Sequence, residues 1–160
     1  MKTLIVYGTN YGTAEKVAKT IKDKISDQVE MVNIKKDSVP NLSEFNKVVI
    51  GSGVKIGMIK KELKSWMNNN CDEIIRKKVF LFLCASSTKT EEIEKIWSAN
   101  YPEKILNSAI AKSSVGGVLD LNKMGFFDKL IIKKVTGQNE SSSNLKEDEI
   151  LNFASLIEKA

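Results

Sequence analysis

The segment Leu4-Ile5-Val6-Tyr7-Gly8-Thr9-Asn10-Tyr11-Gly12-Thr13-Ala14 contains an apolar run, a polar loop and the start of a helical pattern. The run at residues 4–7 predicts a buried strand. Further along, one face of the predicted helix carries Ala14, Val17, Ala18, Ile21 and Ile25. The loop at residues 8–14 therefore joins a strand to a helix N-terminus, where backbone N–H groups converge. Such a loop is typical of a site for a phosphate dianion.

The composition predicts a single globular domain that spans residues 1–160. Hydrophobic residues make up 42% of the chain and charged residues 28%, a balance that supports a sizeable core. No apolar run approaches the roughly 18 residues that a membrane span needs. Met1-Lys2-Thr3 leads directly into the first strand without a small-residue cleavage site. We therefore expect no signal peptide and a cytoplasmic protein.

The chain has no histidine and only two cysteines, Cys71 and Cys84. Histidine is the commonest general base and metal ligand, so its absence argues against Ser-His or Cys-His catalysis. Two cysteines with scattered carboxylates do not form a convincing zinc site, and free thiols are the expected state in a reducing cytoplasm. We expect no catalytic side chain and no metal site, and any chemistry is expected to come from a bound cofactor.

The net charge of +5 has two interpretations. It can reflect a lysine-rich surface exposed to water, or attraction to an anionic partner or membrane surface. Nucleic acid is not expected as a partner, because the lysines are spread along the chain without a recognition motif.

Four further apolar segments follow the first, with helical patterns between them. The predicted strands are Val29–Ile34, Val48–Ile50, Val79–Leu83 and one within Ala109–Leu119. Helical faces are formed by Ile59, Leu63, Trp66 and Met67, by Ile93, Ile96 and Trp97, and by Ile150, Phe153, Ala154 and Ile157. Strands that alternate with helices predict an α/β fold, a doubly wound parallel sheet in a three-layer sandwich. The polar stretch Thr136–Asn144 predicts a mobile surface loop.

In such a sheet, ligands bind beyond the carboxyl ends of the strands, where the strand order reverses. Three loops at that edge are rich in small or hydroxyl-bearing residues, which let backbone approach a flat ligand and add hydrogen bonds. Turn and cap preferences alone would favour the same residues. The candidate binding residues are Thr9, Asn10, Tyr11, Gly12, Thr13 and Ala14 in the first loop, Ser52, Gly53, Val54, Lys55, Ile56 and Gly57 in the second, and Cys84, Ala85, Ser86 and Ser87 in the third.

The first loop resembles the flavodoxin loop that wraps the phosphate of flavin mononucleotide (FMN). Tyr11 and Ala14 stand where threonines are usual, and the residues that match in kind are Thr9, Gly12 and Thr13. The resemblance covers nearly the whole chain. It implies a flavodoxin-like sandwich with a five-stranded parallel sheet in the order 2-1-3-4-5. It also implies that FMN is the cofactor, that the second and third loops hold the isoalloxazine ring, and that the protein carries electrons between partners.

Within that family, the chain is most similar to the quinone-linked, flavodoxin-type protoporphyrinogen oxidases. The similar segments are Val48–Ser52 with Lys55 and Gly57 after it, Gly116–Leu119 and Phe126–Lys133. This similarity implies an alternative function, a menaquinone-dependent protoporphyrinogen dehydrogenase-like oxidoreductase. A second alternative is a non-catalytic, flavodoxin-shaped interaction module. The redox partner would be a protein or a quinone.

Two features of the sequence leave alternatives open. Lys55 predicts a raised reduction potential, because a cation near a reduced flavin favours its anionic form, but it can also be a solvated loop lysine. Gly125–Lys134 combines apolar residues with lysines. That pattern fits an amphipathic helix that touches the inner face of a membrane, or an ordinary helix that packs on the sheet. Trp66 and Trp97 are expected in the core, and Tyr11 either packs locally or contacts the ring.

Overall fold

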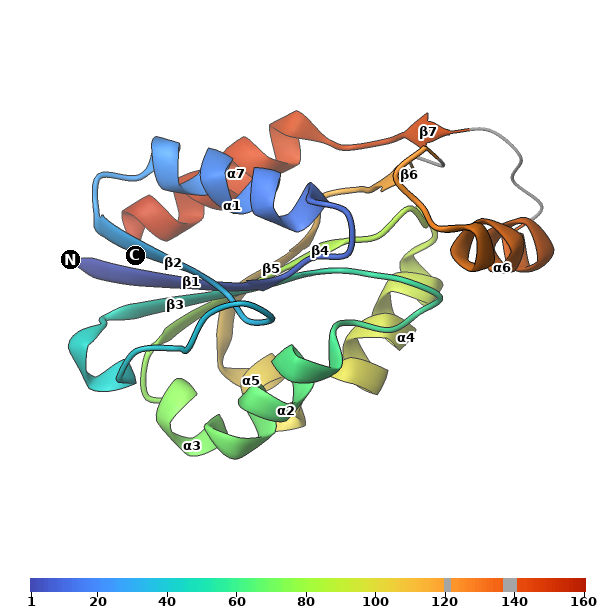
Figure 1. The fold of residues 1–160 in the computed structure, drawn as a ribbon. Coiled ribbons are helices and arrows are strands. Elements are labelled where there is room, and N and C mark those ends of the chain that lie inside the picture. The colour runs from blue at the N-terminus through green and yellow to red at the C-terminus, as the bar shows by residue number, and fades with distance from the viewer. Residues whose placement is uncertain (120–121, 137–140) are drawn as a thin grey trace.

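A parallel sheet lies at the centre of the structure, a computed structural model that describes residues 1–119, 122–136 and 141–160 (Figure 1). The five strands run in the order β2-β1-β3-β4-β5, and all neighbouring pairs are parallel. This confirms the strand order that the family resemblance implies. The strands are β1 (Lys2–Gly8), β2 (Gln28–Asn33), β3 (Lys47–Gly53), β4 (Lys78–Cys84) and β5 (Ala109–Ser114).

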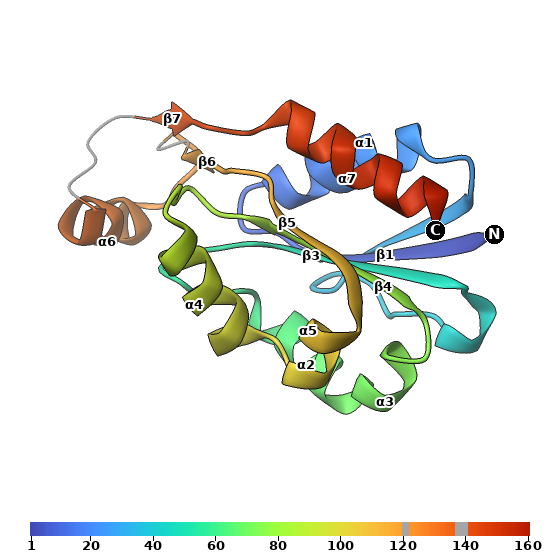
Figure 2. The same ribbon diagram turned by 180° about the vertical axis from the view of Figure 1, so that it is seen from behind.

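Helices cover both faces of the sheet, as Figures 1 and 2 show from opposite sides. One face carries α1 (Thr13–Lys24) and α7 (Glu147–Lys159). The other face carries α2 (Lys61–Asn69), α3 (Cys71–Ile74), α4 (Thr90–Asn100) and α5 (Glu103–Ser108). A short 3₁₀ helix, η1 (Leu42–Glu44), precedes β3. The molecule is therefore the three-layer sandwich that the alternating pattern predicts.

Each face of the sheet has its own hydrophobic core. On one face, Phe153 of α7 packs edge-on against Phe80 and Phe82 of β4, with 6.3 Å between ring centroids in both pairs. On the other face, Trp97 is buried, whereas Trp66 is only half-buried. Strands covered on both sides are apolar throughout, which is why β3 and β4 read as continuous runs in the sequence. The helix residues that face the first core are all buried: Ala14, Val17, Ala18, Ile21, Ile150, Phe153, Ala154 and Ile157.

The chain reverses its direction across the sheet between β1 and β3. β2 lies on one side of β1 and β3 on the other. Gly8 pairs with Ser52 and Gly53 pairs with Cys84, so β1, β3 and β4 end at the same edge. The loops after these strands therefore leave the sheet next to one another, at the point where doubly wound folds bind ligands.

The apolar run Ala109–Leu119 is interrupted, which the sequence did not predict in this form. β5 ends at Ser114, and Gly116 adopts a left-handed conformation with φ +79°. A Cβ at Gly116 would lie 2.1 Å from the carbonyl oxygen of Asn144, so only glycine fits the turn. The following strand β6 (Val118–Leu119) leaves the main sheet and pairs antiparallel with β7 (Ser142–Ser143).

The stretch predicted as a mobile loop, Thr136–Asn144, is only partly described. Residues 137–140 lie outside the described residues, and β7 occupies 142–143. Helix α6 (Phe126–Thr136) precedes these residues, and it confirms the helix expected over most of Gly125–Lys134. In both views α6 stands beyond the carboxyl edge of the sheet rather than on either of its faces, so it is not an ordinary sheet-packing helix.

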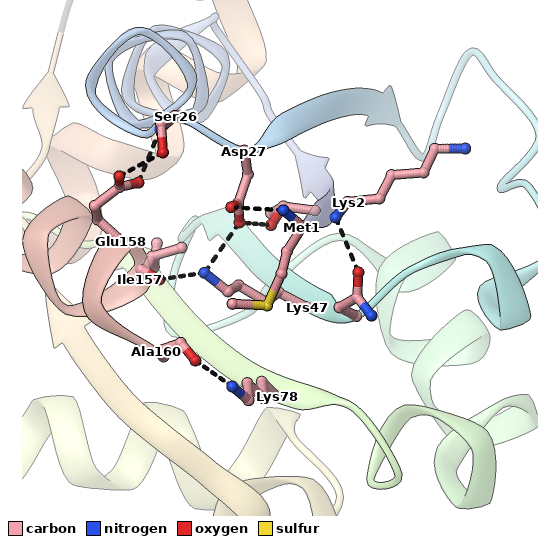
Figure 3. Close-up of polar contacts among 11 residues, drawn as sticks. Met1, Lys2, Ser26, Asp27, Lys47, Lys78, Ile157, Glu158 and Ala160 are labelled. Carbon is pink, nitrogen blue, oxygen red and sulfur yellow. Dashed lines mark hydrogen bonds and ion pairs between the residues drawn. The ribbon is translucent and has the colours of Figure 1, made fainter.

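At the opposite edge, a buried lysine ties the end of α7 to the sheet (Figure 3). The Lys47 side chain is fully buried, and its Nζ lies 3.0 Å from Asp27 Oδ2 and 2.7 Å from the Ile157 carbonyl oxygen. Thr3 Oγ1 donates to the same carboxylate at 2.6 Å. Burial raises the pKa of Asp27, but the hydrogen bonds from Thr3 and Lys47 outweigh it and hold this pKa below its usual value. The buried ammonium group of Lys47 and the carboxylate of Asp27 are thus paired within the protein.

Candidate functional site

A cavity of about 510 Å³ opens at the carboxyl edge of the sheet. This volume lies within the range of small-molecule sites, roughly 300–1,000 Å³. The lining residues come from the loops after β1, β3 and β4 with the adjoining strand and helix ends, from α4, and from residues in or beside β6 and α6. They are Thr9, Asn10, Tyr11, Thr13, Gly53, Val54, Lys55, Ile56, Gly57, Cys84, Ala85, Ser86, Ser87, Glu92, Lys95, Ile96, Ala99, Gly117, Val118, Met124 and Ile132.

The first loop brings the N-terminus of α1 to the cavity. Thr9 Oγ1 accepts a hydrogen bond from the Gly12 N–H at 2.8 Å, which folds the loop back on itself. Gly12 has φ +93° and no side chain with which to cap the helix. The N–H groups of the first turn are therefore open to an external acceptor, and the helix dipole favours an anion there. Glu15, the acidic residue of that turn, pairs with Lys19 at 2.7 Å.

The second loop ends in a tight turn over residues 55–58. The backbones of Lys55 and Met58 exchange two hydrogen bonds, of 2.9 and 3.1 Å. Ile56 has φ +51° and Gly57 φ +70°, values typical of a type I′ turn. A left-handed conformation is costly for a β-branched residue, and such strain clusters at functional sites. Asn100 Nδ2 donates to the Gly57 carbonyl at 2.9 Å, which fixes the turn to the end of α4.

The third loop is held by one asparagine. Asn144 Oδ1 accepts from the Gly117 N–H at 2.8 Å, and Asn144 Nδ2 donates to the Ser86 carbonyl at 2.8 Å. A Cβ at Gly117 would lie 3.0 Å from the Ser86 nitrogen, so the two backbones approach closely. Burial raises the pKa of the Cys84 thiol to about 12, so this cavity-lining sulfur stays protonated at neutral pH. The loop therefore offers a thiol, hydroxyl groups and small side chains.

A carboxylate on α6 joins the first two loops. Lys55 Nζ lies 2.6 Å from Asp128 Oδ1, and the Tyr11 hydroxyl donates to Asp128 Oδ2. The hydrogen bond from Lys55, which has the larger effect, and the hydrogen bond from Tyr11 hold the pKa of Asp128 below its usual value. Burial and the bond to Asp128 raise the pKa of Tyr11 to about 12, so the phenol remains a donor. Met124 and Ile132 pack with Tyr11, which completes the attachment of α6 beside the cavity.

The structure brings the three predicted loops together. All the candidate binding residues line the cavity except Gly12, Ala14 and Ser52. Ala14 is fully buried in the core, and the buried Ser52 Oγ donates to the Gly53 carbonyl at 2.8 Å. Their part in binding, like that of the lining residues, stays a prediction. Tyr11 packs locally against α6, and Lys55 is paired rather than simply solvated.

Two groups of lining residues were not expected from the sequence. One group lies on α4, where a helical spacing of three to four residues could have revealed a shared face: Glu92, Lys95, Ile96 and Ala99. The other group comes from distant segments and had no local signal: Gly117, Val118, Met124 and Ile132. Within the three described segments, no cluster of side chains is suited to hold a metal ion.

The fold is that of a doubly wound α/β protein, and the cavity lies at its switch point. The family model for the flavodoxin domain matches residues 4–146. The chain therefore belongs to the flavodoxin domain family. A search of curated protein sequences found no match.

Solved flavodoxin structures share this fold at low sequence identity. A short-chain flavodoxin associated with a non-canonical PDU bacterial microcompartment has a TM-score of 0.64 and 14% identity, with 99% of this chain and 97% of that chain covered. Two-electron reduced Megasphaera elsdenii flavodoxin has a TM-score of 0.60 and 14% identity, with 99% of each chain covered. The Streptococcus pneumoniae TIGR4 flavodoxin has a TM-score of 0.56 and 13% identity, with 100% of each chain covered.

Proposed function

We propose that the protein binds FMN non-covalently in the cavity and carries electrons between partners. The observation that carries this proposal is the first loop: an α1 N-terminus without a side-chain cap opens onto a cavity of about 510 Å³ at the switch point. This arrangement combines an anion site with room for a flat ring. Membership of the flavodoxin domain family supports the carrier over the protoporphyrinogen dehydrogenase-like enzyme and the interaction module.

In this proposal each loop has a separate task. The first-turn N–H groups of α1, with the Thr9 and Thr13 hydroxyls, hold the phosphate. The turn at 55–58 and the third loop at 84–87 hold the ring between them. When bound, the flavin accepts and releases electrons and takes up protons at its own nitrogen, so no side chain needs to act as an acid or a base. The chain supplies orientation, exclusion of water and the local charge.

The charge beside the ring site is more balanced than the sequence suggested. Lys55 alone would favour an anionic reduced flavin, but Asp128 lies 2.6 Å from its ammonium group. Opposite charges at this distance cancel much of each other's field. We therefore expect Lys55 to raise the reduction potential only modestly in the intact protein. The identity of the electron donor and of the electron acceptor, each a partner protein or a quinone, stays a prediction.

The test of FMN binding is a fluorescence titration with FMN and with riboflavin, which lacks the phosphate. We expect riboflavin to bind at least about tenfold more weakly, because charge-assisted hydrogen bonds are worth roughly 1.5–3 kcal/mol each. Thr13→Val should weaken FMN binding by a similar factor. Thr20→Val is the matched control, since Thr20 lies further along α1 and its hydroxyl donates to the Lys16 carbonyl. Equal affinity for the two flavins would contradict the assigned phosphate loop.

A further inference from the structure

Helix α6 has two different faces. The inward side is anchored by Asp128, through Lys55 and Tyr11, and by Ile132, which packs with Tyr11 and Met124. Asp128 and Ile132 are four residues apart and therefore lie on the same side of the helix. Figures 1 and 2 show that the rest of α6 projects beyond the end of the sandwich. Its opposite side is thus free of the protein core.

The outward side of α6 is strongly apolar. Phe126 is 71% exposed and Phe127 78% exposed, while Leu130 and Ile131 are 49% and 41% exposed. The two phenyl rings contact each other edge-on, with 5.7 Å between centroids, and so form one continuous surface. Large apolar side chains gathered in this way on an exposed helix mark an interaction site.

The charges around this apolar surface are positive. Lys123, Lys133 and Lys134 are exposed and Lys129 is partly exposed. Asp128 is the only acidic residue in the sequence from 122 to 136, and it is engaged on the inward side. The outward side therefore combines phenylalanine, leucine and isoleucine with lysines that pair with no carboxylate of the described residues. This is the composition of helices that lie in the headgroup region of anionic membranes.

We propose that α6 docks the protein on an anionic lipid surface, with Phe126, Phe127, Leu130 and Ile131 inserted among the acyl chains and the lysines at the headgroups. No helix in the described segments is long and apolar enough to cross a membrane, and α6 would lie along the surface. Docking through this surface of α6 does not require a bound flavin. Because α6 borders the cavity, docking would bring the flavin site close to the lipid surface.

The experiment is co-sedimentation of the purified full-length protein with vesicles. One set is phosphatidylcholine alone and the other is an equimolar mixture of phosphatidylcholine and phosphatidylglycerol. We expect binding to the mixed vesicles and much weaker binding to the neutral ones. Replacing both phenylalanines (F126S/F127S) should lower partitioning by at least about tenfold, because each ring contributes a large buried apolar area. Replacing two lysines (K129Q/K133Q) should lower it by about fivefold per lysine.

Matched variants identify the surface that binds. Leu151 and Leu156 of α7 are 43% and 49% exposed, so L151S/L156S removes similar exposed apolar area elsewhere. K22Q/K24Q removes two exposed lysines from the last turn of α1. These controls should bind as the parent protein does. Absence of binding to the mixed vesicles, or equal loss in the α6 and control variants, would overturn the proposal. FMN quenching, measured on the same samples without vesicles, reports separately on the flavin site.

Discussion

The contact between Asp128 and the two loops makes a quantitative prediction about how firmly α6 is held beside the cavity. Asp128→Asn keeps the size of the side chain but removes its charge. The variant amide can accept from one donor, Lys55 or Tyr11, and its NH₂ group then faces the other donor. One charge-assisted hydrogen bond and one ion pair are lost together.

The size of the effect follows from the geometry. Lys55 and Asp128 are 34% and 29% exposed, so solvent screens the pair and its ionic part is worth only about 0–1 kcal/mol. The lost hydrogen bond to a charged group adds roughly 1.5–3 kcal/mol, and the low end applies here because both side chains are partly exposed. We expect α6 to detach from the protein about 1.5 kcal/mol more readily. This corresponds to about a tenfold rise in the population with α6 open.

Hydrogen exchange measures this opening directly. In Asp128→Asn, amides of α6 should exchange about tenfold faster, while those of the central strands should be unchanged. Asp148→Asn, an exposed carboxylate on α7, is the control and should have no such effect. The pKa of Asp128 is lowered in the folded state, so the contact is intact at neutral pH and is lost as the pH falls through that lowered pKa. Unchanged exchange of α6 in the variant at neutral pH would refute this reasoning.

Two further predictions concern charge. Lys55→Ala leaves the Asp128 carboxylate without its counter-ion beside the proposed ring site, so the potential of bound FMN should fall, whereas Asp128→Asn should raise it. Shifts of the same sign in a redox titration would contradict the assignment. Asp27→Asn leaves the buried Lys47 without its counter-ion and should cost about 3–5 kcal/mol in urea unfolding, whereas the exposed Asp23→Asn should cost almost nothing. Since the pKa of Asp27 is lowered by folding, its contribution is present above the unfolded-state value and is lost as pH falls through the folded-state value. A loss below about 1 kcal/mol would show that Lys47 does not need this partner.

Local patterns predicted most of the fold. Continuous apolar runs identified the central strands, because a parallel sheet buried on both faces leaves no alternation. Helical spacing identified the buried sides of α1 and α7. The interruption after Ser114 was harder to predict, because it depends on the close approach of Gly116 to Asn144, which is far along the chain.

The candidate site likewise combines features that local sequence patterns predict with contacts between distant residues that they do not predict. The three loops could be predicted because each follows a strand and carries its own small or hydroxyl residues. The attachment of α6 could not, since Asp128 lies 117 positions from Tyr11 and 73 from Lys55, and nothing local pairs them. Asn100, which holds the second loop from the end of α4, is a buried polar residue whose partner Gly57 lies 43 positions away in the sequence.

FMN binding at the three loops is tested by titrating the purified protein with FMN while its fluorescence and visible absorption are recorded, with riboflavin in parallel. FMN binding predicts saturable quenching of FMN fluorescence, a spectrum typical of a bound flavin and clearly weaker binding of riboflavin. A colourless protein that leaves FMN fluorescence unchanged would contradict it, and the three loops would then be turns without a cofactor.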